Sequence, residues 1–323
     1  MKINIKNIEY FLPKETEDNN SLLIDNPDWI IEDIEKKTGI NNRHIAKSKS
    51  IVDMAELAIR KLLETTDINT NDIDFILLVT QSPLYPLPTS ACILHSRLKL
   101  KKNCIAYDIN LGCSGFVYAL AQAGSLIESG LAEKGLIVCS EKYSQYIDVH
   151  DRSCKPLFSD AAAATLIEKS YDKSEIIGFD LGTDGSGYEN IIVKPDTDEN
   201  YTKTGKLYMN GRSVFMFTMS TVNKSVKSLL KKVNMNINDI DIFIFHQASK
   251  IVFDNLKRTL TIPEDKMFIN YNKIGNTVSA SIPIAIKDAL SAGKLYDGCK
   301  VMFVGFGVGL SWGSCIMKWN NSK

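Results

Sequence analysis

The sequence lacks several features that mark other classes of protein. No apolar run approaches the roughly 18 residues that a membrane-spanning helix needs, and residues 1–6 hold no signal-peptide apolar segment. We therefore expect a cytoplasmic protein that does not enter a membrane. Lys plus Arg and Asp plus Glu both number 38, so the formal net charge is zero. That balance gives no support for a basic, nucleic-acid-binding surface.

Cysteine and histidine are also scarce. The 323 residues include seven cysteines at irregular spacing and four histidines, with no Cys-x-x-Cys and no paired His–Cys cluster. This pattern argues against a zinc site, and we predict no metal. A reducing compartment would keep the thiols free. Most should be small buried apolar residues, although one could be a nucleophile.

What the chain does contain is an internal repeat. Its apolar content of 44% and charged content of 24% are ordinary for a globular protein, but 323 residues are many for one compact α/β unit. A first block recurs at an offset of 167 residues: Leu62-Leu63, Asn69 and residues 71–74 match Leu229-Leu230, Asn236 and residues 238–241. In both copies an amphipathic helix, predicted over residues 51–64 and 214–232, leads through this block into an apolar run.

A second block recurs at an offset of 163 residues. Residues 111–114 match residues 274–277, and each copy opens a predicted helix that ends at a glycine, Gly130 or Gly293. Apolar strands follow at 136–139 and 301–304. Two matched blocks in the same order indicate a duplication, which we divide into halves 1–170 and 171–323.

The duplication predicts where the chemistry lies. Apolar runs 75–79 and 242–245 alternate with helices, which indicates an α/β protein with parallel-leaning sheets. Cys113 and Asn276 occupy equivalent strand-to-helix turns, and His246 ends a strand of the second half. Ligands of such sheets bind beyond the carboxyl ends of strands. We therefore expect the three side chains to meet in a cleft between the halves.

Each of the three residues also has a plainer interpretation. Cys113 lies at a glycine-flanked helix start, where backbone N–H groups favour a thiolate and can hold an oxyanion; it could equally be a packing residue. His246 could be a satisfied core histidine, and Asn276 an N-cap or a left-handed residue. Together they suit stabilisation of an enolate oxygen without a metal. A Cys–His–Asn set also suits a hydrolase, so residue types alone leave the reaction open.

A glycine-rich run at residues 305–313 superficially suggests a dinucleotide-binding loop. It follows a predicted strand but leads into a second strand-like stretch, 314–319, rather than a helix. That context does not fit a dinucleotide fold. Close approach of backbone to a reactive centre explains the glycines better.

These motifs resemble the β-ketoacyl-[acyl-carrier-protein] synthase III family of thiolase-fold condensing enzymes, nearly end to end. The strongest matches are residues 112–116, 246–248, 275–277 and 305–313, with support from residues 38–46 and 151–160. The resemblance implies a thiolase-like five-layered αβαβα sandwich, which the duplication fits, a homodimer, and no cofactor besides acyl-CoA as a substrate.

The resemblance also implies an activity. Cys113 would take an acyl group from acyl-CoA, and malonyl-acyl carrier protein would decarboxylate and attack the acyl-cysteine. His246 and Asn276 would hydrogen-bond the malonyl thioester carbonyl, and the backbone N–H groups of Cys113 and Val308 would form the oxyanion hole. Leu87 matches a position that shapes the acyl pocket across the dimer interface. The other expected substrate-binding residues are Trp29 and Arg152, which would sandwich the CoA adenine, and Arg212, Ser249 and Phe306.

The chain departs from the family at its substrate contacts. Residues 30–37 look like an insertion after Trp29, Arg212 stands where an Asn is usual, Met216 replaces a basic residue, and Val308 replaces a Gly. These changes fit an altered acyl donor or acceptor. The open alternatives are a same-fold acyltransferase with a non-malonyl acceptor in a secondary pathway, and a catalytically silent binding protein. A hydroxymethylglutaryl-CoA-synthase-like reaction fits less well, because no matching Glu is evident.

Overall fold

The computed structural model describes residues 1–171, 176–195 and 205–320. It contains two large mixed β-sheets, each with parallel and antiparallel pairs of strands. The first sheet has the order β1-β7-β6-β4-β5, and the second has the order β11-β12-β13-β8. In that order, the strands of the first sheet are Ile3–Phe11, Ala161–Lys169, Lys134–Glu141, Phe75–Val79 and Ile105–Ile109. Those of the second sheet are Ile242–Phe245, Lys300–Gly307, Ser311–Lys318 and Ile176–Thr183.

The two apolar runs of the repeat are buried strands, as predicted. In β4 and β11 every side chain is buried. Strand β4 pairs in parallel with β5 and β6, and β11 pairs in parallel with β12. Strands β1, β7, β13 and β8 pair antiparallel with their neighbours, so parallel pairing is confined to β4, β5 and β6 in the first sheet and to β11 and β12 in the second.

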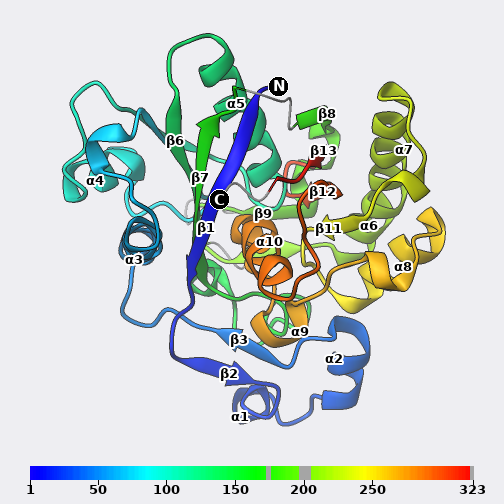
Figure 1. The fold of residues 1–323 in the computed structure, drawn as a ribbon. Helices are drawn as coiled ribbons and strands as arrows, with labels where there is room; N and C mark the ends of the chain where they lie inside the picture. Colours follow the sequence, from blue (N-terminus) through cyan, green and yellow to red (C-terminus); the bar gives the residue numbers. More distant parts are fainter. Residues whose placement is uncertain (172–175, 196–204, 321–323) are drawn as a thin grey trace.

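Helices form three layers around the two sheets. Helices α5 (Gly115–Glu128) and α10 (Ser281–Ser291) share one buried apolar cluster with both sheets and therefore lie between them. Helices α3 (Ile51–Glu64) and α4 (Ser90–Arg97) cover the outer face of the first sheet. Helices α7 (Asn223–Lys232) and α8 (Lys250–Leu260) cover the second sheet on the opposite side of the molecule (Figure 1). This is the five-layered αβαβα arrangement that the sequence predicted.

The repeated turn before each central strand has the same local cause in both halves. Asn69 and Asp72 form a reciprocal capping box around a 3₁₀ turn, and Asn236 and Asp239 form another. Such boxes satisfy the free N–H groups that open a helical turn. The helix predicted over 214–232 is confirmed. It begins at Gly211 and consists of α6 (Gly211–Phe217), a π-helical turn (Thr218–Val222) and α7, with no non-helical residue between them.

The remaining elements are short. In the part of the chain that the structure describes, no helix is long and apolar enough to cross a membrane. The short strands and helices are β2 (Thr16–Asp18), α1 (Leu22–Asp25), α2 (Ile31–Thr38), β3 (Asn42–His44), β9 (Ile191–Val193), β10 (Leu207–Met209) and α9 (Tyr271–Ile274). The 3₁₀ turns are Thr70–Asp72, Tyr143–Tyr146, Gly185–Asn190, Ile237–Asp239, Glu264–Lys266 and Val278–Ala280.

Candidate active site

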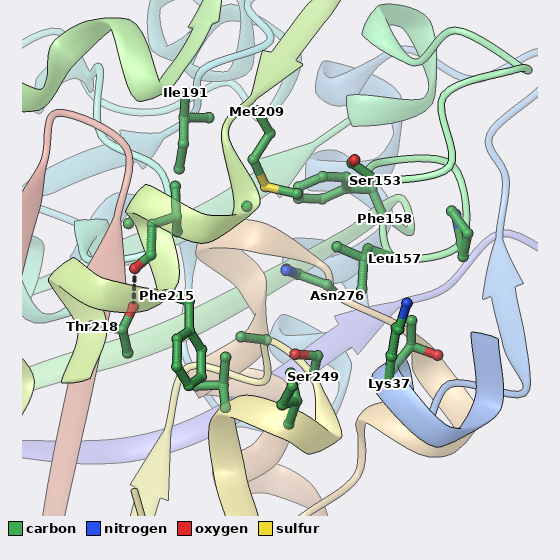
Figure 2. Close-up of a pocket in the computed structure, with 18 of the residues that line it drawn as sticks. Lys37, Ser153, Leu157, Phe158, Ile191, Met209, Phe215, Thr218, Ser249 and Asn276 are labelled. Carbon is green, nitrogen blue, oxygen red and sulfur yellow. Dashed lines mark hydrogen bonds between the residues drawn. The ribbon is translucent and has the colours of Figure 1, made fainter. Parts of the chain in front are cut away.

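A single cavity of about 400 Å³ brings together the three residues singled out in the sequence. Cys113 reaches it from the turn between β5 and α5, His246 from the end of β11, and Asn276 from the turn after α9. In Figure 2 Asn276 lies among Leu157, Phe158 and Ser249, side chains from separate parts of the chain. Apolar side chains form much of the wall, including Leu157, Ile191, Met209 and Phe215.

Glycines allow the backbone to approach Cys113 closely. A Cβ atom on Gly307 would lie 2.9 Å from Cys113 Cβ and 3.0 Å from its Sγ. A Cβ on Gly305 would lie 2.6 Å from the Cys113 carbonyl oxygen. Gly112, directly before Cys113, has no room for a side chain, because a Cβ there would lie 2.4 Å from Gln81 Oε1. The glycine-rich run therefore serves close packing against the thiol, as its sequence context predicted.

The electrostatic state of Cys113 differs from the one its position suggests. Burial and, to a smaller extent, the charge of Glu141 raise the pKa of the thiol to about 12, although hydrogen bonds from the backbone N–H groups of Cys113 and Val308 lower it. We predicted that a helix start would favour the thiolate. The helix start is present, but desolvation of the buried sulfur outweighs it. The resting thiol is therefore protonated at neutral pH.

His246 is a buried neutral imidazole. Its side chain packs edge-on against Phe306 with ring centroids 5.6 Å apart, and Nδ1 lies 2.7 Å from Ser281 Oγ. Burial lowers the pKa of His246 to about 3, against a smaller opposing effect from a hydrogen bond with the Val278 backbone. With Nδ1 engaged by Ser281, Nε2 is the ring nitrogen available to a ligand.

Asn276 has its amide fixed in one orientation. Its Oδ1 accepts a hydrogen bond of 2.9 Å from the Val278 N–H, which leaves the amide NH₂ group as a donor for the pocket. The backbone on either side is anchored, since Asn276 N–H donates to Leu157 and its carbonyl accepts from Ser159. Val278 is buried with φ of +54°, a strained conformation for a β-branched residue.

Four of the remaining predicted residues line the same cavity and three do not. Val308, Arg152, Ser249 and Phe306 are in its wall. Trp29, Leu87 and Arg212 lie outside it; Leu87 is 85% exposed and Arg212 is also exposed.

The expected stacking of the CoA adenine between Trp29 and Arg152 stays a prediction. Arg152 lines the cavity, and its Nη2 lies 3.5 Å from Asp33 Oδ2. Asp33 belongs to α2 (Ile31–Thr38), which forms most of the segment 30–37 that looked like an insertion and which faces the cavity, whereas Trp29 does not line it.

The sequence interpretation missed this helix as part of the site. Asp33, Ile34, Lys37 and Thr38 all line the cavity, and α2 packs against α8. The signal was the spacing of these residues, since positions 33, 34, 37 and 38 form one helical face. Within the ranges the structure describes, no group of three or more His, Cys, Asp and Glu is placed to hold a metal.

Comparisons with known proteins agree along the whole chain. Two family models match: 3-Oxoacyl-[acyl-carrier-protein (ACP)] synthase III over residues 107–185 and its C-terminal model over 230–319. The beta-ketoacyl-[acyl-carrier-protein] synthase III of Clostridium acetobutylicum is 35% identical over 310 residues, covering 94% of both chains. That of Staphylococcus aureus strain Newman is 36% identical over 323 residues, covering 99% of both.

Solved structures give the same result. A crystal structure of 3-oxoacyl-(acyl-carrier-protein) synthase III superimposes with a TM-score of 0.95 at 36% identity, covering 99% of this chain and 100% of that one. The enzyme from Aquifex aeolicus VF5 gives a TM-score of 0.90 at 34% identity, covering 98% and 100%. With the fold, the motifs and near full-length relatives in agreement, this chain belongs to the 3-oxoacyl-[acyl-carrier-protein] synthase III family of thiolase-fold condensing enzymes.

Proposed function

We propose that this enzyme joins an acyl-CoA primer to malonyl-acyl carrier protein by a decarboxylative Claisen condensation at Cys113. The observation that carries the proposal is the convergence of a thiol, a neutral imidazole and a fixed amide on one largely apolar cavity. That set can carry an acyl group on sulfur and stabilise an enolate with neutral donors.

The first step is transfer of the acyl group to the enzyme. Cys113 Sγ attacks the thioester carbonyl of acyl-CoA, the new C–S bond forms, and the bond to the CoA sulfur breaks. The proton of the Cys113 thiol ends on the departing CoA sulfur. Backbone N–H groups of Cys113 and Val308, which already influence the sulfur, stabilise the negative oxygen of the tetrahedral intermediate.

The second step is decarboxylation of the malonyl group. His246 Nε2 and Asn276 Nδ2 donate hydrogen bonds to the malonyl thioester oxygen while the bond to the carboxylate breaks and carbon dioxide leaves. The resulting enolate carbon attacks the acyl-cysteine carbonyl, a carbon–carbon bond forms, and the Cys113 sulfur leaves as a thiolate that takes a proton from water. A 3-oxoacyl-acyl carrier protein is released. A neutral His246 suits this role, because an imidazole N–H can stabilise the enolate oxygen without a formal charge.

Substrate contacts and assembly follow from what surrounds the cavity. Arg152, Ser249 and Phe306 line the cavity, which supports a contact with the pantetheine arm or the acyl group. Trp29 and Arg212 lie outside the cavity and are further candidates. Leu87 and Tyr85 expose large apolar surfaces, 85% and 52% of their area. Such surfaces favour burial against another chain, which supports a homodimer with Leu87 at the interface. A cytoplasmic location stays a prediction from sequence.

A two-part assay tests the proposal. The protein is exposed to a panel of acyl-CoAs, and intact-mass spectrometry shows whether Cys113 is acylated. Malonyl-acyl carrier protein is then added, and carbon dioxide release and a 3-oxoacyl product are measured. Both should appear, and Cys113→Ala should abolish the first. Acylated enzyme that never consumes malonyl groups would instead indicate transfer to another acceptor. No acylation by any donor would indicate a binding protein.

A further inference from the structure

A buried carboxyl group lies beside the site without a part in the chemistry above. Glu141 ends β6 and is fully buried. Its Oε1 accepts from Ser279 Oγ at 2.8 Å, and its Oε2 accepts from Ser82 Oγ at 2.9 Å, the Gln81 N–H at 3.1 Å and Thr80 Oγ1 at 3.5 Å. All four donors are neutral. The next residue, Lys142, directs its ammonium to the Lys49 carbonyl instead.

One side of this carboxyl is connected to the turn that carries Cys113. The Gln81 residue that donates its N–H to Glu141 also places its side-chain oxygen against Gly112, where a Cβ would lie only 2.4 Å away. The Tyr143 hydroxyl donates to the same oxygen at 2.7 Å, which fixes it. Movement of Glu141 would therefore disturb the residue immediately before Cys113.

The other side is connected to the loop that carries Asn276. Ser279, which donates to Glu141, follows directly after Val278. The Val278 N–H holds Asn276 Oδ1, and the Val278 backbone also bonds His246. One carboxyl group thus joins segments from both halves of the chain, each of which presents a catalytic side chain.

We propose that Glu141 is a positioning residue of the condensing site, tying the Cys113 turn to the Asn276 loop and bringing a carboxyl group near the nucleophile. The proposal rests on the function assigned to Cys113, His246 and Asn276. It adds a residue that touches no substrate and acts through its hydrogen bonds and its charge.

The charge of Glu141 changes near neutral pH. Burial raises its pKa to about 7, although Ser279 and the other donors lower it. In its charged form it raises the pKa of four neighbours, which are Cys113, Cys139, Tyr143 and Tyr146. Of these, Cys113 and Tyr143 line the cavity, and Cys113 is the nucleophile of the proposed reaction. Below neutral pH Glu141 is protonated and this effect on Cys113 disappears.

The test measures how fast iodoacetamide alkylates Cys113 at different pH values in wild type and Glu141→Gln. Peptide mass spectrometry must report the site, because Cys92 is exposed and also reacts. The two rates should agree below about pH 6, where Glu141 is protonated, and the variant should react several-fold faster above about pH 8, where only the wild type has a negative charge at position 141. A ratio that does not change with pH would overturn the proposal.

Two further variants separate charge from structure. Asp160→Asn removes another buried carboxyl, which accepts from the Ala46 and Ser144 N–H groups, and any change it causes in the alkylation rate should be independent of pH. Ser279→Ala keeps the Glu141 carboxyl but removes a hydrogen-bond donor that lowers its pKa. The pH at which the alkylation rate of Cys113 responds to Glu141 should therefore be higher in this variant than in wild type. The same pH in both would also contradict the proposal, even if Glu141→Gln does not fold. Alkylation needs no acyl donor, so these outcomes are independent of whether the condensation assay succeeds.

Discussion

Gly307→Ala tests whether catalysis depends on the close approach of the glycine-rich strand to the nucleophile. The added methyl would lie 2.9 Å from Cys113 Cβ and 3.0 Å from Sγ, whereas ordinary contacts begin near 3.4 Å. The thiol would therefore move by roughly half an ångström. Misplacing a reacting group by 1 Å can cost about 100-fold in rate, so about tenfold slower acylation is expected. Overpacking should also reduce the free energy of unfolding by about 1–3 kcal/mol.

The assay is single-turnover acylation by an acyl-CoA, followed by intact-mass spectrometry, with urea unfolding on the same samples. Gly185→Ala is the matched control, because a Cβ there meets no atom within 4 Å. It should acylate at the wild-type rate. The reasoning is refuted if Gly307→Ala acylates as fast as Gly185→Ala, since the strand would then yield without displacing the thiol.

Three other changes give distinct expectations. Gly305→Ala should be more destabilising than Gly307→Ala in urea unfolding, because its Cβ would meet the Cys113 carbonyl at 2.6 Å and Ser114 Cα at 2.7 Å, and backbone cannot rotate away. Asn276→Ala should still form acyl-Cys113 but release carbon dioxide about 10²–10³-fold more slowly; equal losses in both steps would contradict this. Folding lowers the pKa of His246 from 6.5 to about 3. Between these pH values the unfolded chain binds one more proton than the folded chain, so the free energy of unfolding decreases as the pH falls. In urea unfolding, His246→Gln should therefore lose less stability than wild type between pH 7 and pH 4; an equal loss in both would count against the burial of His246 as the cause.

The duplicated architecture could be predicted because its causes are local. The same Asn and Asp residues build the same capping box before β4 and before β11, and continuous apolar runs are typical of central parallel strands. The place of Cys113 and Asn276 in one cavity follows from equivalent turns facing each other. The close approach of β12 to Cys113 could also be predicted from Gly305 and Gly307, because a backbone that passes so close leaves no room for a Cβ.

What could not be predicted depends on contacts between distant segments. The contact of Arg152 with Asp33 depends on how α2 packs, and nothing in the sequence indicates it. The π-helical turn at Thr218–Val222 lies inside an amphipathic pattern that predicts an ordinary helix. Glu141 also gave no signal, because its hydrogen-bond donors come from residues 80, 81, 82 and 279, which only the folded chain brings together.

Burial also separates two reactions that the residue types left open. A Cys–His hydrolase works with a thiolate activated by a nearby imidazolium, which requires a lowered thiol pKa. Here burial raises the pKa of Cys113 and lowers that of His246, so at neutral pH both groups are uncharged. An uncharged imidazole beside an amide NH₂ group can donate to a developing enolate oxygen, but it is a weak base for activating water. The same three side chains therefore favour condensation over hydrolysis because the fold removes them from solvent.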